Sequence, residues 1–358
     1  MAMTDGQHGG GVLRAARELG RPVAELFDFS ASINPLGTPV GALQAAREAL
    51  DLAGHYPEIA AASLGAALAA HHRLPERCVL PGNGSTELLY LLPRVLRPRR
   101  ALVVVPAFSE YGRSLHSAGT ALDAFALRPE DDFRLDPEAL LESLHPDTDL
   151  VLLANPANPT GVGIGPEVLE ELARRLRGRA LLAVDEAFVD FCPALSVIGR
   201  VPVLDNLWVF RSLTKFYALA GLRAGYLAGP AGGVARLAAA KEPWTLSTPA
   251  LEAAKACLAE NDFRRRTLEA IPPLRRALAE GLEELGMTVF AGQANYLLAR
   301  LEERMPGAAE IAAALRPIGI LIRDCANFPP LDGRYLRVAV RGERENLRLL
   351  EALTEVLK

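Results

Sequence analysis

Short apolar runs typical of β-strands alternate with helical patterns over much of this chain. Seven runs lie in the first two thirds: Cys78–Leu80, Ala101–Val105, Ala121–Ala126, Leu150–Ala154, Ala180–Val184, Leu207–Arg211 and Ala224–Leu227. The helical patterns between them include Ser85–Val95, Pro137–Ser143 and Pro166–Arg177. Strands that alternate with helices favour a mostly parallel sheet covered on both faces. The sequence therefore predicts an α/β fold with a seven-stranded, mostly parallel sheet.

The pattern changes towards the C-terminus. Residues 249–285 read as one long helical region, which we expect to break or kink near Pro272-Pro273 because proline removes a helical hydrogen bond. Four β-like runs and two helices follow: Thr288–Phe290, Tyr296–Ala299, Ile320–Arg323 and Tyr335–Val340, with helices Ala308–Leu315 and Arg344–Leu357. This mixture predicts a smaller α+β domain. We place an N-terminal arm at residues 1–45, the large domain at 46–245 and the small domain at 246–358.

Composition limits the class of protein. Of the 358 residues, 50% are hydrophobic, which is enough for a substantial core. The net charge of −4 and the absence of a basic stripe argue against nucleic acid as a partner. The polar start has no signal-peptide core, and no apolar run reaches the roughly 18 residues of a membrane span. The four cysteines are isolated and no Cys or His pair has metal-ligand spacing, so we expect reduced thiols, no metal and a cytoplasmic location.

The segment 210–226 carries the most specific chemical signal. Lys215 follows a β-like run and stands beside the hydroxyl residues Ser212 and Thr214, and Arg223 comes shortly after it. An amine held in this way suits a Schiff base, and the hydroxyls and the arginine suit a phosphate. Pyridoxal phosphate needs both attachments. The alternative explanation is a surface lysine in a Ser/Thr loop.

Asp185 lies at the end of the apolar run Ala180–Val184. At the C-terminal end of a buried parallel strand, its carboxylate would point into the ligand crevice of the sheet. An aspartate beside the ring nitrogen of pyridoxal phosphate keeps the proton that makes the ring an electron sink. Taken alone, Asp185 is explained equally well as a cap of the segment that follows.

Two loops add weaker signals. The loop 155–161 contains two Asn-Pro steps and a glycine, a rigid turn that can hold the Asn158 amide against a ring hydroxyl. The loop before the next helical pattern contains Gly84, Ser85 and Thr86, and backbone N–H groups at such a helix start form an anion site. The first loop is also a common turn, and the second is also an ordinary helix cap.

The order of these signals is more specific than each of them. A phosphate loop, an Asn-Pro turn, a strand-end aspartate, a lysine and an arginine in this order resemble the fold-type I enzymes that depend on pyridoxal phosphate, and more narrowly the histidinol-phosphate aminotransferase group. The resemblance runs from about Asp28 to the C-terminus. It implies that Phe108 stacks on the cofactor ring and that the N-terminal arm packs with the small domain. It also implies a homodimer with shared sites, in which Tyr56 reaches the cofactor phosphate of the neighbouring subunit.

Further motifs resemble the branch of this group that decarboxylates L-threonine phosphate in cobalamin biosynthesis. They are His8-Gly9-Gly10, Asp28–Gly37, Asp185–Phe191, Ile322–Phe328 and Tyr335–Arg341. The branch implies a substrate-binding set made of His8, Ser32, Asn158, Arg323 and Arg337. The two arginines end or interrupt apolar strands, where exposed strand-edge cations are the alternative explanation.

The sequence departs from these patterns at two positions. Ser32 stands where asparagine is usual, and Phe188 stands where the aminotransferases carry a tyrosine that donates to the ring oxygen. Because Phe188 cannot donate, Asn158 would hold that oxygen alone.

Three functions remain to be compared. We expect a decarboxylase of L-threonine O-3-phosphate, a small phosphorylated amino acid, with Lys215 and Asp185 as catalytic residues. The runner-up is a histidinol-phosphate aminotransferase, against which the motif at His8 and the identity of Phe188 count. The cofactor motifs serve both reactions, so the placement of the substrate carboxylate and phosphate decides between them. A regulator that binds the cofactor without turnover is more remote, because such proteins usually add a basic helix-turn-helix segment and too few residues precede Asp28.

Overall fold

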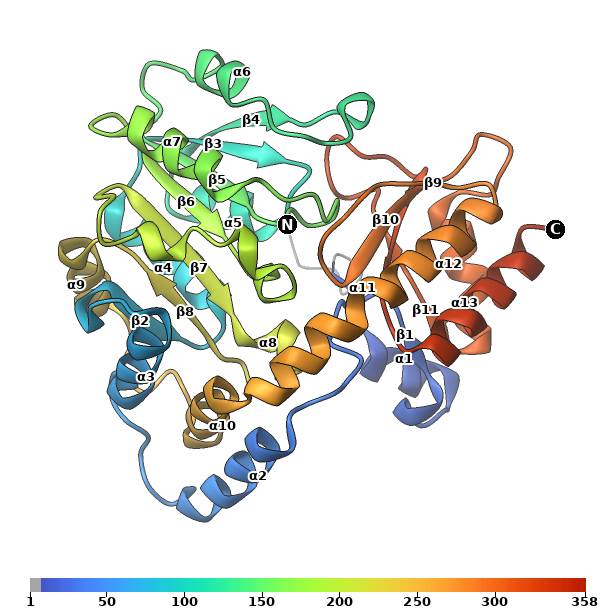
Figure 1. Ribbon diagram of the computed structural model, residues 1–358, viewed down its shortest axis with the longest axis horizontal. Helices are drawn as coiled ribbons and strands as arrows, with labels where there is room; N and C mark the ends of the chain where they lie inside the picture. The colour runs from blue at the N-terminus through green and yellow to red at the C-terminus, as the bar shows by residue number, and fades with distance from the viewer. Residues whose placement is uncertain (1–7) are drawn as a thin grey trace.

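The computed structural model describes residues 8–358, and a seven-stranded sheet forms the centre of its larger part (Figure 1). The strand order is β2-β8-β7-β6-β5-β3-β4. The strands are β2 Val79–Gly82, β3 Arg100–Val105, β4 Ala121–Ala126, β5 Leu150–Ala154, β6 Leu181–Asp185, β7 Leu207–Ser212 and β8 Gly225–Ala228. Strands β3 to β7 pair in parallel, and β8 runs antiparallel to both of its neighbours. The predicted mostly parallel α/β sheet is therefore confirmed.

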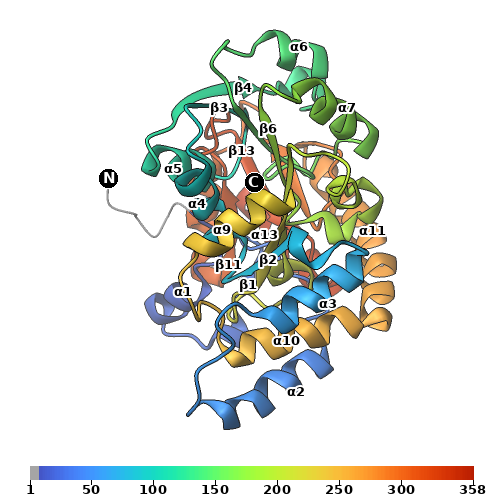
Figure 2. The same cartoon turned by 90° about the vertical axis from the view of Figure 1, so that its left-hand side faces the viewer.

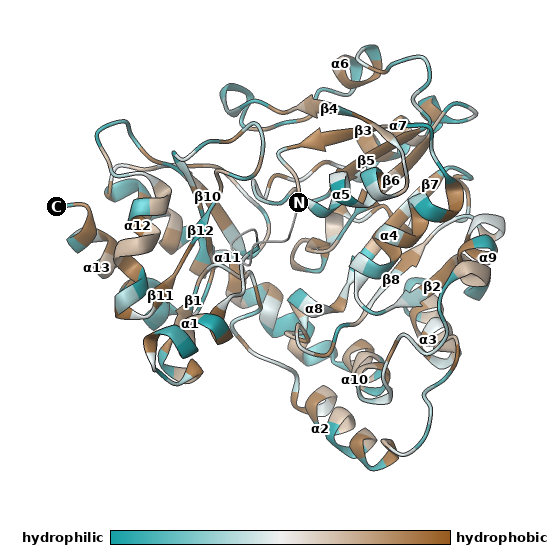
Figure 3. Cartoon of the chain, turned by 180° about the vertical axis from the view of Figure 1, so that it is seen from behind, coloured by the Kyte–Doolittle hydropathy of each residue, from teal (hydrophilic) through white to brown (hydrophobic). Residues whose placement is uncertain are grey.

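Helices cover both faces of this sheet, and the core divides accordingly into two layers. On one face, the strands pack against α4 Ser85–Leu96, α5 Glu110–Ser117 and α9 Ala231–Ala240. On the other, they pack against α3 Ala62–His72, α7 Pro166–Leu176 and α10 Thr248–Ala259. The interior strands β5 and β7 are buried along almost their whole length and are mostly hydrophobic (Figure 3), because a covered parallel strand has no solvent face. At the sheet edge, β4 alternates between exposed and half-buried residues.

The C-terminal part forms a separate antiparallel sheet with the order β12-β13-β10-β9. Its strands are β9 Thr288–Val289, β10 Tyr296–Arg300, β12 Arg323–Asp324 and β13 Tyr335–Ala339. The long helix α11 Asn261–Glu284 and α12 Ala308–Leu315 pack against this sheet, and α13 Glu343–Val356 packs against both helices (Figure 1). This part supplies the arginines considered below.

The N-terminal segment lies against the C-terminal part. Strand β1 Phe27–Asp28 pairs in parallel with β11 Ile320–Leu321, and α1 Val12–Leu19 precedes it. The chain then leaves this region, and α2 Val40–Glu48 packs against α10, next to α3 (Figure 2). The short helices α6 Pro137–Glu142 and α8 Leu213–Phe216 complete the fold. None of the helices in residues 8–358 is long and apolar enough to cross a bilayer.

Two sequence predictions were wrong in detail. The region 249–285 is two helices that separate at Glu260, and α11 continues through Pro272-Pro273. Both prolines are exposed, so water can hydrogen-bond to the backbone carbonyls that proline leaves without a donor. The run Ile320–Arg323 is likewise two strands, because β11 pairs with β1 whereas β12 pairs with β13.

Candidate active site

One pocket opens at the carboxyl ends of β6 and β7, where the N-terminal segment and the C-terminal part meet the large sheet. It brings together fourteen residues that the sequence singled out: His8, Ser32, Ser85, Thr86, Phe108, Asn158, Asp185, Phe188, Ser212, Thr214, Lys215, Arg223, Arg323 and Arg337. Gly84 lies directly behind it, against the guanidinium of Arg223. Of the predicted site residues, Tyr56 alone lies elsewhere on the described chain.

Lys215 lies in α8, directly after β7. Ser212 caps this helix, because its Oγ accepts from the Thr214 N–H at 3.3 Å and lies 2.7 Å from the Thr214 Oγ1. Burial lowers the pKa of the Lys215 amine to about 8, and the charges of Arg223 and Arg337 add to this effect. A buried amine that loses its proton near neutral pH is suited to act as a nucleophile.

Asp185 ends β6, and its carboxylate has two fixed partners. Its Oδ2 accepts from the Tyr111 hydroxyl at 2.7 Å, and its Oδ1 accepts from the Ala187 N–H at 3.0 Å. Burial raises the pKa of Asp185, while these hydrogen bonds and the Lys215 charge oppose the rise. A cation placed beside this carboxylate would therefore be stabilised.

Tyr111 was missed by the sequence analysis. It lies in α5, its ring is 5.9 Å from that of Phe108 in an edge-on arrangement, and it is fully buried. Its place three residues after Phe108 is the one signal that the sequence offered. Glu110, beside it, was missed as well and contacts His8.

A cradle for an anion lies at the start of α4. Gly84 has φ +74° and precedes the helix, and a Cβ at this position would lie 2.6 Å from Nη2 of Arg223. Only glycine therefore lets the arginine approach the first turn, where Ser85 and Thr86 line the pocket and the N–H groups of a helix start have no partner within the helix. The helix start and the guanidinium together favour a phosphate.

Two buried arginines form the opposite wall. Arg337 of β13 donates from Nη2 to the Ser30 carbonyl at 2.7 Å and from Nη1 to Oδ1 of Asn158, and its Nε has no partner. Because arginine only donates, this contact orients the Asn158 amide so that its NH2 group remains a donor. Arg323 of β12 donates to Oδ1 of Asn327 at 2.6 Å. Burial lowers the pKa of both guanidinium groups, which an anion between them would offset.

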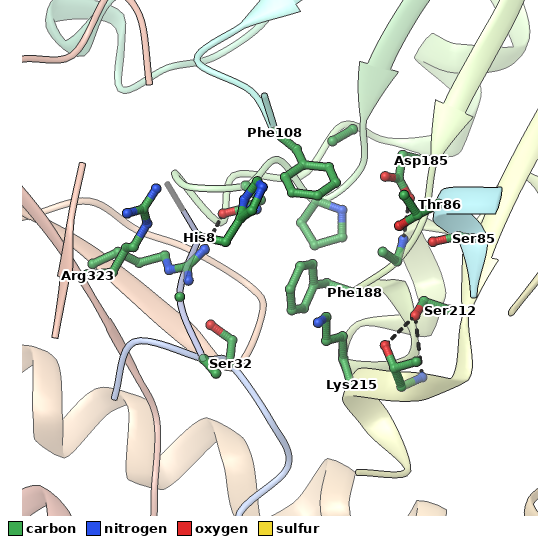
Figure 4. Close-up of a pocket in the computed structure, with 18 of the residues that line it drawn as sticks. His8, Ser32, Ser85, Thr86, Phe108, Asp185, Phe188, Ser212, Lys215 and Arg323 are labelled. Carbon is green, nitrogen blue, oxygen red and sulfur yellow. Dashed lines mark hydrogen bonds between the residues drawn. The ribbon is translucent and has the colours of Figure 1, made fainter. Parts of the chain in front are cut away.

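Two smaller groups complete this wall. Ser32 is buried with an Oγ that has no hydrogen-bond partner. The His8 ring lies 5.5 Å from the ring of Phe108, and its Nε2 is 3.1 Å from Oε1 of Glu110. Figure 4 shows His8 and Arg323 on one side of the pocket, with Asp185, Thr86 and Ser212 across from them. The pocket therefore has a cationic side and a side suited to a cofactor.

Phe188 and Tyr56 occupy different surroundings. The Phe188 ring is buried and meets the ring of Tyr296 edge-on at 4.9 Å, while the Tyr296 hydroxyl donates to the Ala157 carbonyl. Tyr56 is 83% exposed and rests on Trp244 with ring centroids 5.0 Å apart. Its predicted reach into a neighbouring subunit stays a prediction.

The family follows from comparison with known proteins. Residues 24–353 match the model of the family described as aminotransferase class I and II. The chain belongs to this family. A threonine-phosphate decarboxylase of Salmonella typhimurium is 40% identical to this chain, over 100% of this chain and 98% of the relative. A histidinol-phosphate aminotransferase of Nitratidesulfovibrio vulgaris is 33% identical over 94% of this chain and 90% of the relative.

One of the solved structures similar to this chain contains a bound cofactor. The histidinol-phosphate aminotransferase of Sinorhizobium meliloti in complex with pyridoxal 5'-phosphate has a TM-score of 0.87 and 25% identity, covering 97% of this chain and 95% of that one. The predicted fold-type I architecture is therefore confirmed, and so is the prediction that this chain is an enzyme.

The residues of the pocket fit pyridoxal phosphate, the cofactor of the class I and II aminotransferases. Lys215 is an amine with a lowered pKa, and Asp185 is a buried carboxylate that a neighbouring cation would stabilise. The start of α4, beside Arg223, is suited to bind an anion. These three groups are the complements of an aldehyde, a protonated ring nitrogen and a phosphate. The cofactor predicted from the sequence is confirmed by family membership and by this match.

Proposed function

We propose that this chain removes CO2 from L-threonine O-3-phosphate and yields (R)-1-amino-2-propanol O-2-phosphate, a step of cobalamin biosynthesis. The observation that carries the proposal is the cationic wall, in which His8, Arg323 and Arg337 face the pocket that contains Lys215. A substrate with a carboxylate and a phosphate brings two anionic groups, and a wall with several separate cations matches both. The full-length likeness to a threonine-phosphate decarboxylase supports the same reaction.

The cofactor side of the site would be shared by many reactions. Bound pyridoxal phosphate supplies an electron sink for the pair that remains when a bond to the substrate's amine-bearing carbon breaks. Lys215 would bind the aldehyde carbon, and Asp185, held by Tyr111, would keep the proton on the ring nitrogen. The remaining contacts fall into three groups: Gly84, Ser85, Thr86, Ser212, Thr214 and Arg223 for the phosphate, Phe108 for the ring face, and Asn158 for the ring oxygen.

The cationic wall would decide which bond breaks. The bond held perpendicular to the ring is the one whose electrons enter the ring system. An arginine that fixes the substrate carboxylate in that position favours loss of CO2, and the carbon then takes up one proton. Arg337 and Arg323 can each make a two-pronged contact with a carboxylate or a phosphate, and His8 and Ser32 can contribute further donors.

A product assay tests the proposal. Purified protein with pyridoxal phosphate is incubated with L-threonine phosphate, and CO2 and the amine product are measured. A parallel reaction contains histidinol phosphate with 2-oxoglutarate, because a histidinol-phosphate aminotransferase is 33% identical to this chain. Release of CO2 in the first reaction supports the proposal. Transamination in the second reaction without CO2 in the first would reject it.

We also propose a homodimer in which Tyr56 serves the neighbouring site. Three large apolar side chains are exposed beside one another: Tyr56, Ile59 and Trp244. The Tyr56 and Trp244 rings are in contact, and the Trp244 N–H donates to the Ile59 carbonyl, so these three residues share one region. Burial of such side chains in a second copy would remove them from water.

Mixed dimers test the shared site. We expect a Tyr56→Phe chain mixed with a Lys215→Ala chain to form hybrids whose activity differs from that of either parent. A sedimentation experiment that finds an active monomer with tightly bound cofactor would contradict the proposal.

We further propose a cytoplasmic location, since all four cysteines are free thiols.

A further inference from the structure

Glu110 is a buried carboxylate at the edge of the pocket for which the proposed function has no use. It begins α5 and is 6% exposed. Its Oε2 accepts from the Tyr90 hydroxyl at 2.5 Å, and its Oε1 accepts from Nη1 of Arg113 at 3.1 Å. The same Oε1 lies 3.1 Å from Nε2 of His8. A buried carboxylate with three fixed partners has a defined position, and its one partner that lines the pocket is His8.

His8 reaches Glu110 from the other side of the pocket. The Gly10 N–H donates to Oγ of Ser30 at 2.9 Å, and Ser30 is held in turn by Oδ1 of Asp28 at 2.6 Å. Gly9 passes so close to Ser30 that a Cβ there would lie 2.0 Å from the Ser30 carbonyl oxygen. Asp28 belongs to β1, which pairs with β11 of the C-terminal part. The His8–Glu110 contact therefore joins the two walls of the pocket.

The contact also fixes the chemistry of the imidazole. Because a carboxylate accepts, Nε2 of His8 carries a proton, and Nδ1 remains as the nitrogen available to a ligand. An imidazole donates from both nitrogens only when it is protonated. The other charged groups around His8 are Arg113, paired with Glu110, and the arginines of the cationic wall.

We propose that Glu110 is a positioning residue that makes the site selective for phosphorylated substrates by orienting His8 as a donor to the phosphate. This inference rests on the proposed function, in which His8 contacts the substrate. Glu110 itself touches neither substrate nor cofactor. Its effect should therefore appear with ligands that carry a phosphate and be absent with ligands that lack one.

Two ligands, one with a phosphate and one without, test this selectivity. Isopropyl phosphate carries the phosphate but no amine or carboxylate, and L-threonine carries the amine and carboxylate but no phosphate. Binding of isopropyl phosphate to the cofactor-loaded enzyme is measured by calorimetry, and binding of L-threonine by the change in cofactor absorbance. We expect Glu110→Gln, which keeps the shape but removes the charge, to weaken isopropyl phosphate binding about tenfold and to leave L-threonine binding unchanged. Glu76→Gln, at an exposed position, is the matched control.

A double-mutant cycle tests whether Glu110 acts through His8. His8→Gln should produce the same phosphate-selective loss, and the variant with both changes should lose no more than His8→Gln alone. Equal losses for both ligands in Glu110→Gln, or an unchanged affinity for isopropyl phosphate, would overturn the proposal. If Glu110→Gln does not fold, His8→Gln still decides, because undiminished isopropyl phosphate binding in that variant would also overturn it.

The proposed decarboxylation and the proposed role of Glu110 can be rejected independently of each other. A wild-type enzyme that decarboxylates L-threonine phosphate but shows no selective loss in Glu110→Gln leaves the proposed function intact and removes this inference. A wild-type enzyme that releases no CO2 removes the proposed function, while the isopropyl phosphate measurements still report on Glu110 and His8.

Discussion

The two sides of the pocket are built in different ways. The cofactor side comes from the strand ends and following helix starts of one sheet, with Ser85 at the start of α4, Asp185 at the end of β6 and Lys215 just after β7. The cationic side comes from opposite ends of the chain, with His8 near the start and Arg337 near the end. The first side depends on local turns and strand ends, whereas the second depends on the pairing of β1 with β11.

The sides also differ in charge. Among the described residues that line the pocket, Asp185 is the one carboxylate, and it lies on the cofactor side. Arg323, Arg337 and His8 line the other side, whereas Arg223 lies with the cofactor side, and Arg337 is one of the charges that lower the pKa of Lys215. This difference suggests a division of labour in which one side holds the cofactor and the other chooses the reaction. Variants on each side should therefore fail in different ways.

The largest effect is expected at Lys215, at the centre of the cofactor side. Lys215→Ala and Lys215→Arg should both abolish essentially all turnover, because neither side chain offers a neutral amine to an aldehyde. The absorbance band of the lysine-bound cofactor should disappear in both variants as well. An Ala variant that keeps both the band and the turnover would show that another amine holds the cofactor.

Asp185→Asn should cause the next largest loss. It removes the charge that keeps the ring nitrogen protonated, and the loss of such a buried partner costs several kcal/mol, so the rate should fall about a hundredfold or more. Steady-state kinetics on cofactor-saturated protein give the measurement. A rate close to that of the wild type would assign the role to a different residue.

On the cationic side, Arg337→Ala and Arg323→Ala should each weaken substrate use while the cofactor absorbance band persists. Loss of one charged contact costs about 2 kcal/mol or more, which corresponds to roughly thirtyfold in kcat/KM. Arg344→Ala, at an exposed position of α13, is the control. Loss of the absorbance band in either variant would contradict the division between the two sides.

The smallest effect concerns pH and links the two sides. In protein without cofactor, the Lys215 amine becomes neutral as the pH rises through its pKa of about 8. The rate of cofactor attachment should therefore rise with pH up to about this value and level off above it. Removal of the positive charge in Arg337→Ala should raise the pKa and move the midpoint to higher pH. A midpoint that stays fixed or moves to lower pH would contradict the electrostatic link.

The strands and the grouping of the cofactor-side residues at their ends could be predicted from the sequence because the signals are local. Each of the seven β-like runs became a strand of one sheet, and the lysine, the aspartate and the glycine-containing loop follow directly from strand ends. The split of Ile320–Arg323 between two sheets was not predictable, since it depends on pairing with β1, about 290 residues away in the chain. Glu110 and Tyr111 escaped notice because their partners, His8 and Asp185, are distant in sequence.

If the cationic side directs this site towards loss of CO2, the product formed in heavy water will show it. Wild-type enzyme with pyridoxal phosphate is given L-threonine phosphate in D2O, and the product is analysed by mass spectrometry and NMR. We expect one CO2 for each amine product and one deuterium on the carbon that lost the carboxylate. A keto acid that retains its carboxylate, formed in amounts that depend on an added amino acceptor, would contradict it.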